Sequence, residues 1–407
     1  MADTLKPRDG KEVEAAVQWA LAEGKAMEIV GHGSKRAIGR PAQTDVTLDL
    51  SALSGVTLYE PEELVLSARA GTPLAEVETL LAERGQQLAF EPMDYGPVLQ
   101  GTAGRGTIGG ALAANLAGPR RIKAGAARDH FLGFTAVSGR GETFKSGGRV
   151  VKNVTGYDLC KLVAGSWGTL AAMTEVTIKV LPRPETEATV LIRGLGPAQA
   201  VAAMTAAMGS ACDVSGAAHL PAEVTAAIPE VAGTGDALTA LRLEGFAASV
   251  AHRRETLAAL LNPSGAVAML GAEASQKLWR AVRDATPFAG AGGGARPLWR
   301  ISTAPSRGAE LGALLAREAD ARTLYDWAGG LIWLALDPTD DAGAALVRRA
   351  LAVTGGHATL VRAPAAVRAA VEVFPPEEAA LAALTRRVKA SFDPRGVLNP
   401  GRMWAGV

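Results

Sequence analysis

Cysteine is scarce in this sequence of 407 residues, which contains only Cys160 and Cys212. Two thiols are too few for a disulfide framework, for a four-thiolate iron–sulfur cluster or for a structural zinc site. The five histidines supply no pair at the spacing of helical metal ligands. We therefore expect no metal centre in this chain.

An excess of charge of either sign is also missing. The chain has 42 Lys and Arg residues against 41 Asp and Glu residues, a formal net charge of +1. This balance gives no electrostatic footprint for nucleic acid or for an anionic membrane. The tightest basic cluster consists of Arg120, Arg121 and Lys123. It is too short for a binding tract, and it fits a solvated loop and a local anion contact equally well.

Long hydrophobic runs are absent, since no uninterrupted apolar segment approaches the roughly 20 residues that cross a bilayer. The first residues, MADTLKPRDG, contain no basic stretch followed by an apolar run, so we expect no signal peptide. Hydrophobic residues make up 48% of the chain and charged residues 20%. These values are typical of a cytoplasmic globular protein, and the length allows two or three domains.

The first part of the chain alternates helices and strands. Asp9 and Glu12 form a cap-like pair before a helix whose apolar residues share one face. A second helix is expected to begin at residues 72–73 and to end at Gly85. Strands are expected at residues 26–30, 64–70, 131–137, 150–154 and 174–181.

The prolines Pro182 and Pro184 follow the last of these strands and mark a domain boundary. Beyond them the residue pattern is typical of an alanine-rich α+β domain, with a helix after Pro197 and a glycine-rich loop near residues 290–294. No internal repeat is apparent. Strands are expected at residues 189–192, 238–243, 298–302 and 331–336.

Residues 91–121 are rich in glycine and small side chains and have no regular period. Gly104, Gly106 and Gly109 match the GxGxxG dinucleotide fingerprint, but no buried strand leads into them, so we do not expect a Rossmann site. Glycine N–H groups can still approach a pyrophosphate closely. A short helix starting near Gly110 would point its positive end at the same anion.

Another glycine loop, Gly31-His32-Gly33-Ser34-Lys35, follows a strand directly and offers a second anion nest. A third segment, KNVTGYDL at residues 152–159 with GSWGTL at residues 165–170, places amide, hydroxyl and carboxylate groups beside more glycine. Either of the first two loops alone could be a tight turn. Both together fit a long ligand with two phosphates better.

In their order along the chain, these segments resemble the FAD-binding domain of the vanillyl-alcohol-oxidase or p-cresol methylhydroxylase (PCMH) superfamily. The similar motifs are VGHGSK, GTIGGALAAN, KNVTGYDL with GSWGTL, and TEVTIKVLP. The closing FDPRGVLNPGRM resembles the C-terminal signature of the glycolate and D-lactate dehydrogenase branch. The resemblance is strong over residues 8–185 and moderate over the last thirty.

The resemblance implies an α+β fold in three parts. A PCMH-type two-lobed FAD-binding domain is expected at residues 1–184, and a smaller, ferredoxin-like α+β cap domain at residues 185–375. A C-terminal segment at residues 376–407 is expected to return to the flavin domain. The implied FAD is non-covalent, because members that attach it through this loop carry the histidine directly before the Ser or Thr. Here Gly33 holds that place, and His32 stands one position earlier.

Site residues are implied position by position. Residues 31–35 would wrap the pyrophosphate, the GTIGGALAAN residues would line the flavin and its diphosphate, and the third segment would lie near the isoalloxazine or its ribityl chain. Residues 175–178 would contact the adenine end through the backbone. The full set of implied cofactor-binding residues is Gly31, His32, Gly33, Ser34, Lys35, Gly106, Thr107, Gly109, Gly110, Ala113, Asn115, Asn153, Thr155, Gly156, Asp158, Glu175 and Ile178.

One feature of the catalytic members of this branch is missing here. They carry a His-Ala-Gly-Asp-Gly-Asn-like run and a second metal-binding histidine region, whereas Gly355-Gly356-His357-Ala358-Thr359 lacks the acidic residue and the following Asn-x-His. We therefore interpret His357 as structural or solvent-facing. With the short loop ending in Gly33-Ser34-Lys35 and the LNPGRM ending, the chain is most similar to the FAD-binding E subunits of bacterial glycolate oxidases.

This similarity implies an oxidoreductase subunit with two partners, a second FAD subunit and an iron–sulfur subunit, in a complex peripheral to the inner membrane. Such a complex oxidises glycolate or D-lactate by hydride transfer from C2 to flavin N5 while a base takes the hydroxyl proton. Tyr157, His130 and Asp158 are the titratable residues nearest the flavin segment, but none is identified as the base; Arg128 and Asp129 are expected to form a local ion pair. The alternatives are a non-catalytic assembly or electron-relay subunit, and a free-standing NADPH-dependent flavin reductase.

Overall fold

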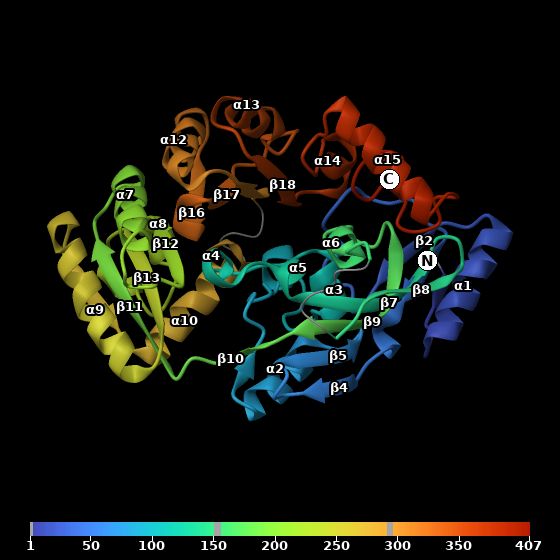
Figure 1. Cartoon of the computed structure of the whole chain (residues 1–407). Helices are drawn as coiled ribbons and strands as arrows, with labels where there is room; N and C mark the ends of the chain where they lie inside the picture. Colours follow the sequence, from blue (N-terminus) through green and yellow to red (C-terminus); the bar gives the residue numbers. More distant parts are fainter. Residues whose placement is uncertain (1–2, 150–155, 291–295) are drawn as a thin grey trace.

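The computed structural model describes residues 3–149, 156–290 and 296–407 (Figure 1). The expected strand at residues 150–154 and most of the expected glycine loop at residues 290–294 lie outside these ranges. Within them, no helix is long and apolar enough to cross a membrane. The other strands expected from the sequence are present; those at residues 298–302 and 331–336 agree at both ends, and the rest differ by a few residues.

The N-terminal part forms two lobes with one main sheet each, and β6 (Gln86–Gln87) and β10 (Leu181–Pro182) add a small two-stranded sheet. A parallel sheet has the order β1-β3-β2, and an antiparallel sheet has the order β4-β5-β9-β7-β8. The parallel strands are β1 (Asp3–Leu5), β3 (Val46–Asp49) and β2 (Met27–Val30). The antiparallel strands are β4 (Val56–Glu60), β5 (Val65–Arg69), β9 (Ala171–Lys179), β7 (Phe131–Ser138) and β8 (Thr143–Gly147).

Helix α1 (Gly10–Glu23) shows how the sequence fixes an element locally. The Asp9 carboxylate accepts hydrogen bonds from the N–H groups of Lys11 and Glu12, which confirms the expected cap. The Glu12 carboxylate does not accept a hydrogen bond from the N–H of Asp9; it accepts one from the N–H of Arg8 instead. The helix ends at Gly24 in the left-handed conformation, with φ of 62°.

A single antiparallel sheet of eight strands dominates the second part, in the order β14-β11-β13-β12-β16-β17-β15-β18. It consists of two consecutive βαββαβ units that join where β12 pairs with β16. The first unit contains β11 (Thr186–Arg193), α7 (Pro197–Met208), β12 (Gly216–Leu220), β13 (Leu238–Gly245), α9 (Ala247–Leu261) and β14 (Val267–Leu270). The second contains β15 (Leu298–Ser302), α12 (Gly308–Glu318), β16 (Ala321–Asp326), β17 (Leu331–Leu336), α13 (Ala344–Thr354) and β18 (His357–Arg362).

This arrangement confirms the expected α+β fold with a ferredoxin-like cap, and it adds a repeat that the sequence does not reveal. Each unit has the strand order of a ferredoxin-like fold, and the two orders mirror each other about the β12–β16 pair. A repeat of topology leaves no sequence signal when different residues fill equivalent core positions. The expectation that the chain has no internal repeat is therefore wrong at the level of structure.

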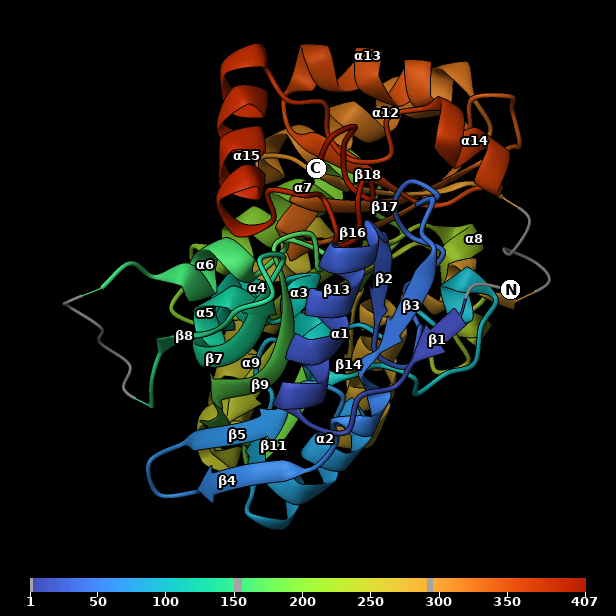
Figure 2. The same ribbon diagram turned by 90° about the vertical axis from the view of Figure 1, so that its right-hand side faces the viewer.

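The two faces of the eight-stranded sheet bury different partners. On β15, Trp299 and Ile301 pack under α12 and α13, whereas Leu298 joins a core shared with Phe90 and Ile108 of the N-terminal part. Figure 2 shows α12 and α13 above β16, β17 and β18, with β2 and β3 below. The sheet thus closes over the N-terminal lobes, and its inner face is available to form a site.

The C-terminal residues extend back to the N-terminal lobes. After α14 (Ala365–Ala370) and α15 (Ala379–Phe392), Leu398 forms a parallel bridge with Met27 of β2. Val397 and Leu398 are buried in the same core as α1. From these contacts we propose the division into residues 1–184, 185–375 and 376–407.

A buried ionic network ties the cap sheet to the N-terminal part. Arg242 of β13 is 1% exposed and binds both carboxylate oxygens of Glu91, at 2.9 and 3.0 Å. Arg120 bridges Glu91 at 2.9 Å and Glu244 of β13 at 2.7 Å. Burial alone would raise the pKa of Glu244, but Arg242 and Arg120 lower it to about 2. The network therefore stays ionised at neutral pH.

Replacing Glu91 should be strongly destabilising, because it leaves the buried Arg242 without its bidentate partner. We expect Glu91→Gln to lower the free energy of unfolding by about 3–5 kcal/mol in urea melts at pH 7. The matched control is Asp213→Asn, which removes an exposed ion pair with Lys123 and should change stability by less than about 1 kcal/mol. Because carboxylates with a lowered folded pKa stabilise only while ionised, the wild type should lose stability as pH falls from about 4 toward 2. Equal unfolding energies for the two variants would contradict the role given to Glu91.

Candidate functional site

The first glycine loop turns sharply at the end of β2. The N–H of Arg36 donates to the Gly33 carbonyl at 3.1 Å, and the N–H of Ile38 donates to the Lys35 carbonyl at 3.1 Å. Gly33 has a φ of 74°, which favours glycine. A Cβ added at Gly31 would lie 2.8 Å from Oγ1 of Thr107. Glycine at position 31 therefore lets the first and second loops approach each other.

The second loop enters a short helix, α3 (Ile108–Ala113), two residues before the expected start. Thr107 is its N-cap, and Oγ1 of Thr107 accepts a hydrogen bond from the N–H of Gly110 at 3.2 Å. The lead-in to the GxGxxG residues is the 3-10 turn η2 (Pro97–Leu99) and not a strand. The segment is therefore not a Rossmann loop.

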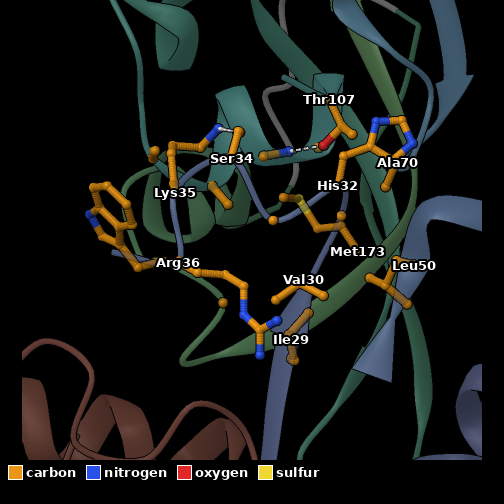
Figure 3. A pocket seen from close by; sticks show the side chains of 18 of the residues that line it. Ile29, Val30, His32, Ser34, Lys35, Arg36, Leu50, Ala70, Thr107 and Met173 are labelled. Atoms are coloured by element: carbon orange, nitrogen blue, oxygen red, sulfur yellow. Dashed lines mark hydrogen bonds between the residues drawn. The ribbon is translucent and has the colours of Figure 1, made fainter. Parts of the chain in front are cut away.

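The two loops and the GSWG segment surround one cavity (Figure 3). Nine of the expected residues line it, namely Gly31, His32, Gly33, Ser34, Lys35, Thr107, Gly109, Gly110 and Ala113. The sequence did not identify several others as lining residues, namely Ile29, Val30, Arg36, Leu50, Ala70, Ala114, Trp167, Gly168, Ala171, Met173 and Arg402. Five of these lie in the motifs VGHGSK, GTIGGALAAN, GSWGTL and LNPGRM, so position within a motif was the available signal for Val30, Ala114, Trp167, Gly168 and Arg402.

Asn399 of the C-terminal signature holds two walls of this cavity in place. It is 1% exposed, and its side-chain oxygen accepts from the N–H of Ile29 at 2.8 Å. Its side-chain nitrogen donates to the Trp167 carbonyl at 2.8 Å. Arg402 donates to the Lys35 carbonyl at 2.8 Å. Through these hydrogen bonds, the C-terminal signature holds the first loop and the GSWG segment in place.

Two cations face this cavity without a matching anion. In the part of the chain that the structure describes, neither Lys35 nor Arg402 forms an ion pair with a carboxylate. Lys35 donates only to Oγ of Ser34, at 3.2 Å, and Nε of Arg402 has no hydrogen-bond partner. Burial lowers the pKa of Lys35 to about 8, with Arg402 adding to the effect, and burial lowers the pKa of Arg402 to about 10. An anion in the cavity would relieve both penalties.

Further cavities adjoin this one on two sides. A polar cavity shares residues 30–33 and Arg36 with it and adds Lys6, Asp49 and Arg105. On the other side, a cavity beneath the cap sheet shares Ala114 and Trp167 with it. The three cavities are neighbours that share lining residues, from the parallel sheet to the inner face of the cap, and this series suits a long ligand.

Some expected residues lie away from the central cavity. Gly106 packs against Leu74, and Asn115 lines the cavity beneath the cap sheet. Gly156 and Asp158 are exposed, and Asp158 caps α6 (Leu159–Val163). Asn153 and Thr155 lie outside the described residues.

The expected contacts of Glu175 and Ile178 with the cofactor find no support in the geometry. Both residues lie within β9, where Glu175 pairs with β5 and β7. Ile178 pairs with the same two strands and is fully buried. A central strand has no free backbone groups for a ligand. It is Ala171 and Met173, nearer the start of β9, that line the central cavity.

The residues considered as a catalytic base are each accounted for otherwise. Tyr157 is 91% exposed, and both ring nitrogens of His130 lie within hydrogen-bonding distance of backbone carbonyls. The ion pair expected between Arg128 and Asp129 is not formed; Asp129 pairs with Lys161 at 3.6 Å because the chain brings α6 alongside. Among residues 3–149, 156–290 and 296–407, no group of three His, Cys, Asp or Glu residues could hold a metal ion.

Solved structures share this architecture. A structure of p-cresol methylhydroxylase with substrate bound aligns with a TM-score of 0.73 at 14% identity, covering 99% of this chain and 88% of that one. The 4-ethylphenol oxidase from Gulosibacter chungangensis aligns with a TM-score of 0.74 at 14% identity, covering 99% and 89%. These likenesses establish the PCMH-type fold.

Sequence comparisons identify the family. Residues 2–147 match the model of the FAD binding domain, and residues 376–403 match that of the C-terminal domain of FAD linked oxidases. The glycolate oxidase subunit GlcE of Escherichia coli K12 is 34% identical over 390 residues, 96% of this chain and 95% of that protein. The glycolate oxidase subunit GlcD of Bacillus subtilis 168 is 26% identical, over 74% of this chain and 68% of that protein. The chain therefore belongs to the FAD-linked oxidase family that includes GlcE, and it is an oxidoreductase with FAD as its cofactor.

Proposed function

We propose that this chain is the FAD-binding subunit of a glycolate oxidase complex that oxidises glycolate or D-lactate to the 2-oxo acid. The structural observation that carries the proposal is the pair of uncompensated cations, Lys35 and Arg402, in a cavity built by three glycine loops. The similarity to GlcE over nearly the full length of both chains supports the assignment to that complex.

The proposed position of the FAD follows from the charges. The pyrophosphate lies against residues 31–35, Thr107 and Gly110, where Lys35 and Arg402 compensate its two negative charges. Figure 3 shows the Lys35 amine beside Ser34, with the Thr107 hydroxyl in the same cavity. Binding is non-covalent in this proposal, as the placement of His32 in the loop implies.

Ala114 and Trp167 line both the central cavity and the cavity beneath the cap sheet, so they would hold the isoalloxazine end of the FAD. When bound, FAD supplies the acceptor for the hydride that leaves C2 of the hydroxy acid. The chain's own part is to bind and orient. The loops fix the cofactor, the cap sheet covers the substrate position, and the packed interface limits access of water.

Electrons are proposed to leave through an iron–sulfur partner. Cys160 and Cys212 are the only cysteines of the chain, and both are buried free thiols. Burial raises the pKa of Cys160 to about 12, which disfavours the thiolate that ligates iron. The proposal also includes a second FAD subunit as a partner. It places the complex in the cytoplasm, in peripheral contact with the inner membrane.

The purified chain, reconstituted with FAD, tests the proposal directly. We expect a yellow protein with one FAD per chain. Anaerobic addition of glycolate or D-lactate to the complex should bleach the flavin absorbance. Bleaching by the complex but not by this chain alone would favour the electron-relay alternative. Bleaching by NADPH alone would favour a free-standing reductase, and failure to bind FAD would refute the proposal.

Replacing Lys35 should raise the stability of the apoprotein and lower its affinity for FAD. Lys35→Met removes a partly buried, uncompensated cation, so the apoprotein should melt at a higher temperature while FAD binds at least about tenfold more weakly. Binding to the wild type should weaken above pH 8, up to tenfold per pH unit, because the anion requires the protonated amine and the pKa of Lys35 is about 8. The variant should lack this dependence near pH 8. Lys11→Met, an exposed lysine on α1, is the control; a variant that binds FAD like the wild type would contradict the placement.

Gly110 and Gly109 should differ although both line the cavity. A Cβ at Gly110 would lie 3.0 Å from Oγ1 of Thr107 and 3.4 Å from Nζ of Lys35, both side-chain atoms, so Gly110→Val should displace the cofactor at a smaller cost to the apo fold than Gly109→Val. A Cβ at Gly109 would lie 2.7 Å from both Cβ and the carbonyl oxygen of Ala70, so Gly109→Val should destabilise the apoprotein itself. FAD stoichiometry and apo melting temperatures measure the two effects. Full FAD occupancy in Gly110→Val would place the pyrophosphate elsewhere.

A further inference from the structure

We propose that the outer edge of β14 is the contact surface between two copies of this chain, which pair antiparallel there and join their cap sheets into one. β14 ends the eight-stranded sheet and pairs only with β11 in the described part of the chain. Figure 1 shows the neighbouring helices α9 and α10 (Ala272–Arg283) on the side of the molecule away from both termini. None of residues 265–271 lines the central cavity or its two neighbours, so this assembly is independent of the FAD site.

The backbone groups that face outward on this edge belong to alternate residues. The N–H of Arg193 donates to the carbonyl of Ala266 at 3.0 Å, in register with the ladder between β11 and β14. Hydrogen-bonded and non-hydrogen-bonded pairs alternate along an antiparallel ladder. Val267 and Met269 therefore direct their N–H and C=O groups away from β11, toward any strand that adds to this edge.

This edge lacks the protection that other sheet edges of the chain carry. At the opposite end of the cap sheet, β18 is covered where the N–H of Leu360 donates to the Val373 carbonyl at 2.8 Å. In the N-terminal part, β4 ends in Glu60 and β8 carries Lys145, and charges of this kind disfavour the addition of a strand. β14 has the sequence VAML, without charge or proline, and Met269 is 41% exposed. An apolar, uncovered edge of this kind pairs readily with another strand.

The sequence around β14 favours a second copy of the same chain as the added strand. Residues 265–271 read GAVAMLG, with glycine at both ends and an apolar residue on each side of the central Ala268. When two such strands pair about a two-fold axis at Ala268, Val267 of one copy stands opposite Met269 of the other. These are the two residues whose backbone groups face outward, so both of their pairs are hydrogen bonded. The edge is therefore complementary to itself in this register.

The side chains of the paired strands are complementary on both faces. Val267 packs into the core that contains the buried residues of α9, whereas Ala268 and Leu270 pack into the core on the other face. Met269 shares the face of Val267, because side chains alternate along a strand. In the paired sheet, Met269 of each copy lies against Val267 of the other, which removes apolar surface from water. The two Ala268 residues form a non-hydrogen-bonded pair, in which small side chains fit the close approach.

Sedimentation equilibrium of the FAD-loaded chain measures the assembly, and we expect a reversible dimer. Val267→Pro removes an outward N–H and keeps the ladder with β11, so it should raise the dimer Kd at least about tenfold without unfolding the sheet. Met269→Lys should also raise the Kd, because it places two like charges diagonally across the two-fold axis. Val353→Lys, at an exposed apolar residue of α13, is the matched control and should leave the Kd unchanged.

A cysteine cross-link tests the register of the pairing. Cys160 and Cys212 are both buried, so an added cysteine at the edge provides the reactive thiol. Ala268→Cys should form a disulfide-linked dimer under mild oxidation, because this residue lies opposite itself with Cα atoms about 4.5 Å apart. Ala266→Cys is the matched control; it lies opposite Leu270 of the other copy and should not cross-link. The fraction of linked dimer is read on a non-reducing gel.

A monomeric wild type, or edge variants with the wild-type dimer Kd, would overturn the interface. Cross-linking through Ala266→Cys in place of Ala268→Cys would overturn the two-fold register. A chain that is monomeric alone and pairs through this edge only with the second FAD subunit would overturn the assignment to a second copy. FAD content should stay at the wild-type level in every variant, so failure of this interface leaves the proposed FAD placement intact.

Discussion

The side-chain amide of Asn399 is the contact on which the site depends most. It joins the N–H of Ile29, before the first glycine loop, to the carbonyl of Trp167, on the opposite wall of the cavity. Both backbone groups would otherwise be left without a hydrogen bond, at a cost of about 1–3 kcal/mol each. Segments at residues 29, 167 and 399 are far apart in sequence, and one fully buried amide holds all three together. The C-terminal signature is therefore a structural part of the cofactor site, although it is remote in sequence.

Positive charge without a carboxylate partner among the described residues lies at one point of the central cavity, at Lys35 with Arg402. Buried Arg242 is paired with Glu91, whereas buried Arg368 donates to the backbone carbonyls of Ala363 and Gly39. Folding alone does not favour a buried cation without a counter-ion, so the positions of Lys35 and Arg402 are understandable as sites where a ligand supplies the missing charge. The uncompensated cations lower the stability of the apoprotein and strengthen the binding of an anion. A cofactor that binds there therefore raises the free energy of unfolding of the whole fold.

Much of the fold could be predicted from the sequence. Strands such as β15 and β17 alternate or run apolar clearly enough that residues 298–302 and 331–336 are correct at both ends. The glycine loops and Thr107 were identified because glycine, hydroxyl and lysine near strand ends have a specific physical use. In contrast, the pairing of β12 with β16 and the mirrored βαββαβ units depend on long-range contacts that leave no local pattern. Glu175 and Ile178 were misplaced relative to the cavity for the same reason, because their neighbours β5 and β7 are remote in sequence.

The sequence could not distinguish the roles of Arg120 and Arg121, because these roles depend on whether a carboxylate partner is present. Arg121 stands beside Arg120 in one basic cluster, yet Arg120 has two carboxylate partners and Arg121 has none. Sequence composition treats them alike, since either a solvated loop or an anion contact fits the cluster. Only the folded positions of Glu91 and Glu244 leave Arg120 neutralised and Arg121 exposed beside the ring of Trp327. Two neighbouring arginines thus acquire different electrostatic environments from the partners that folding gives them.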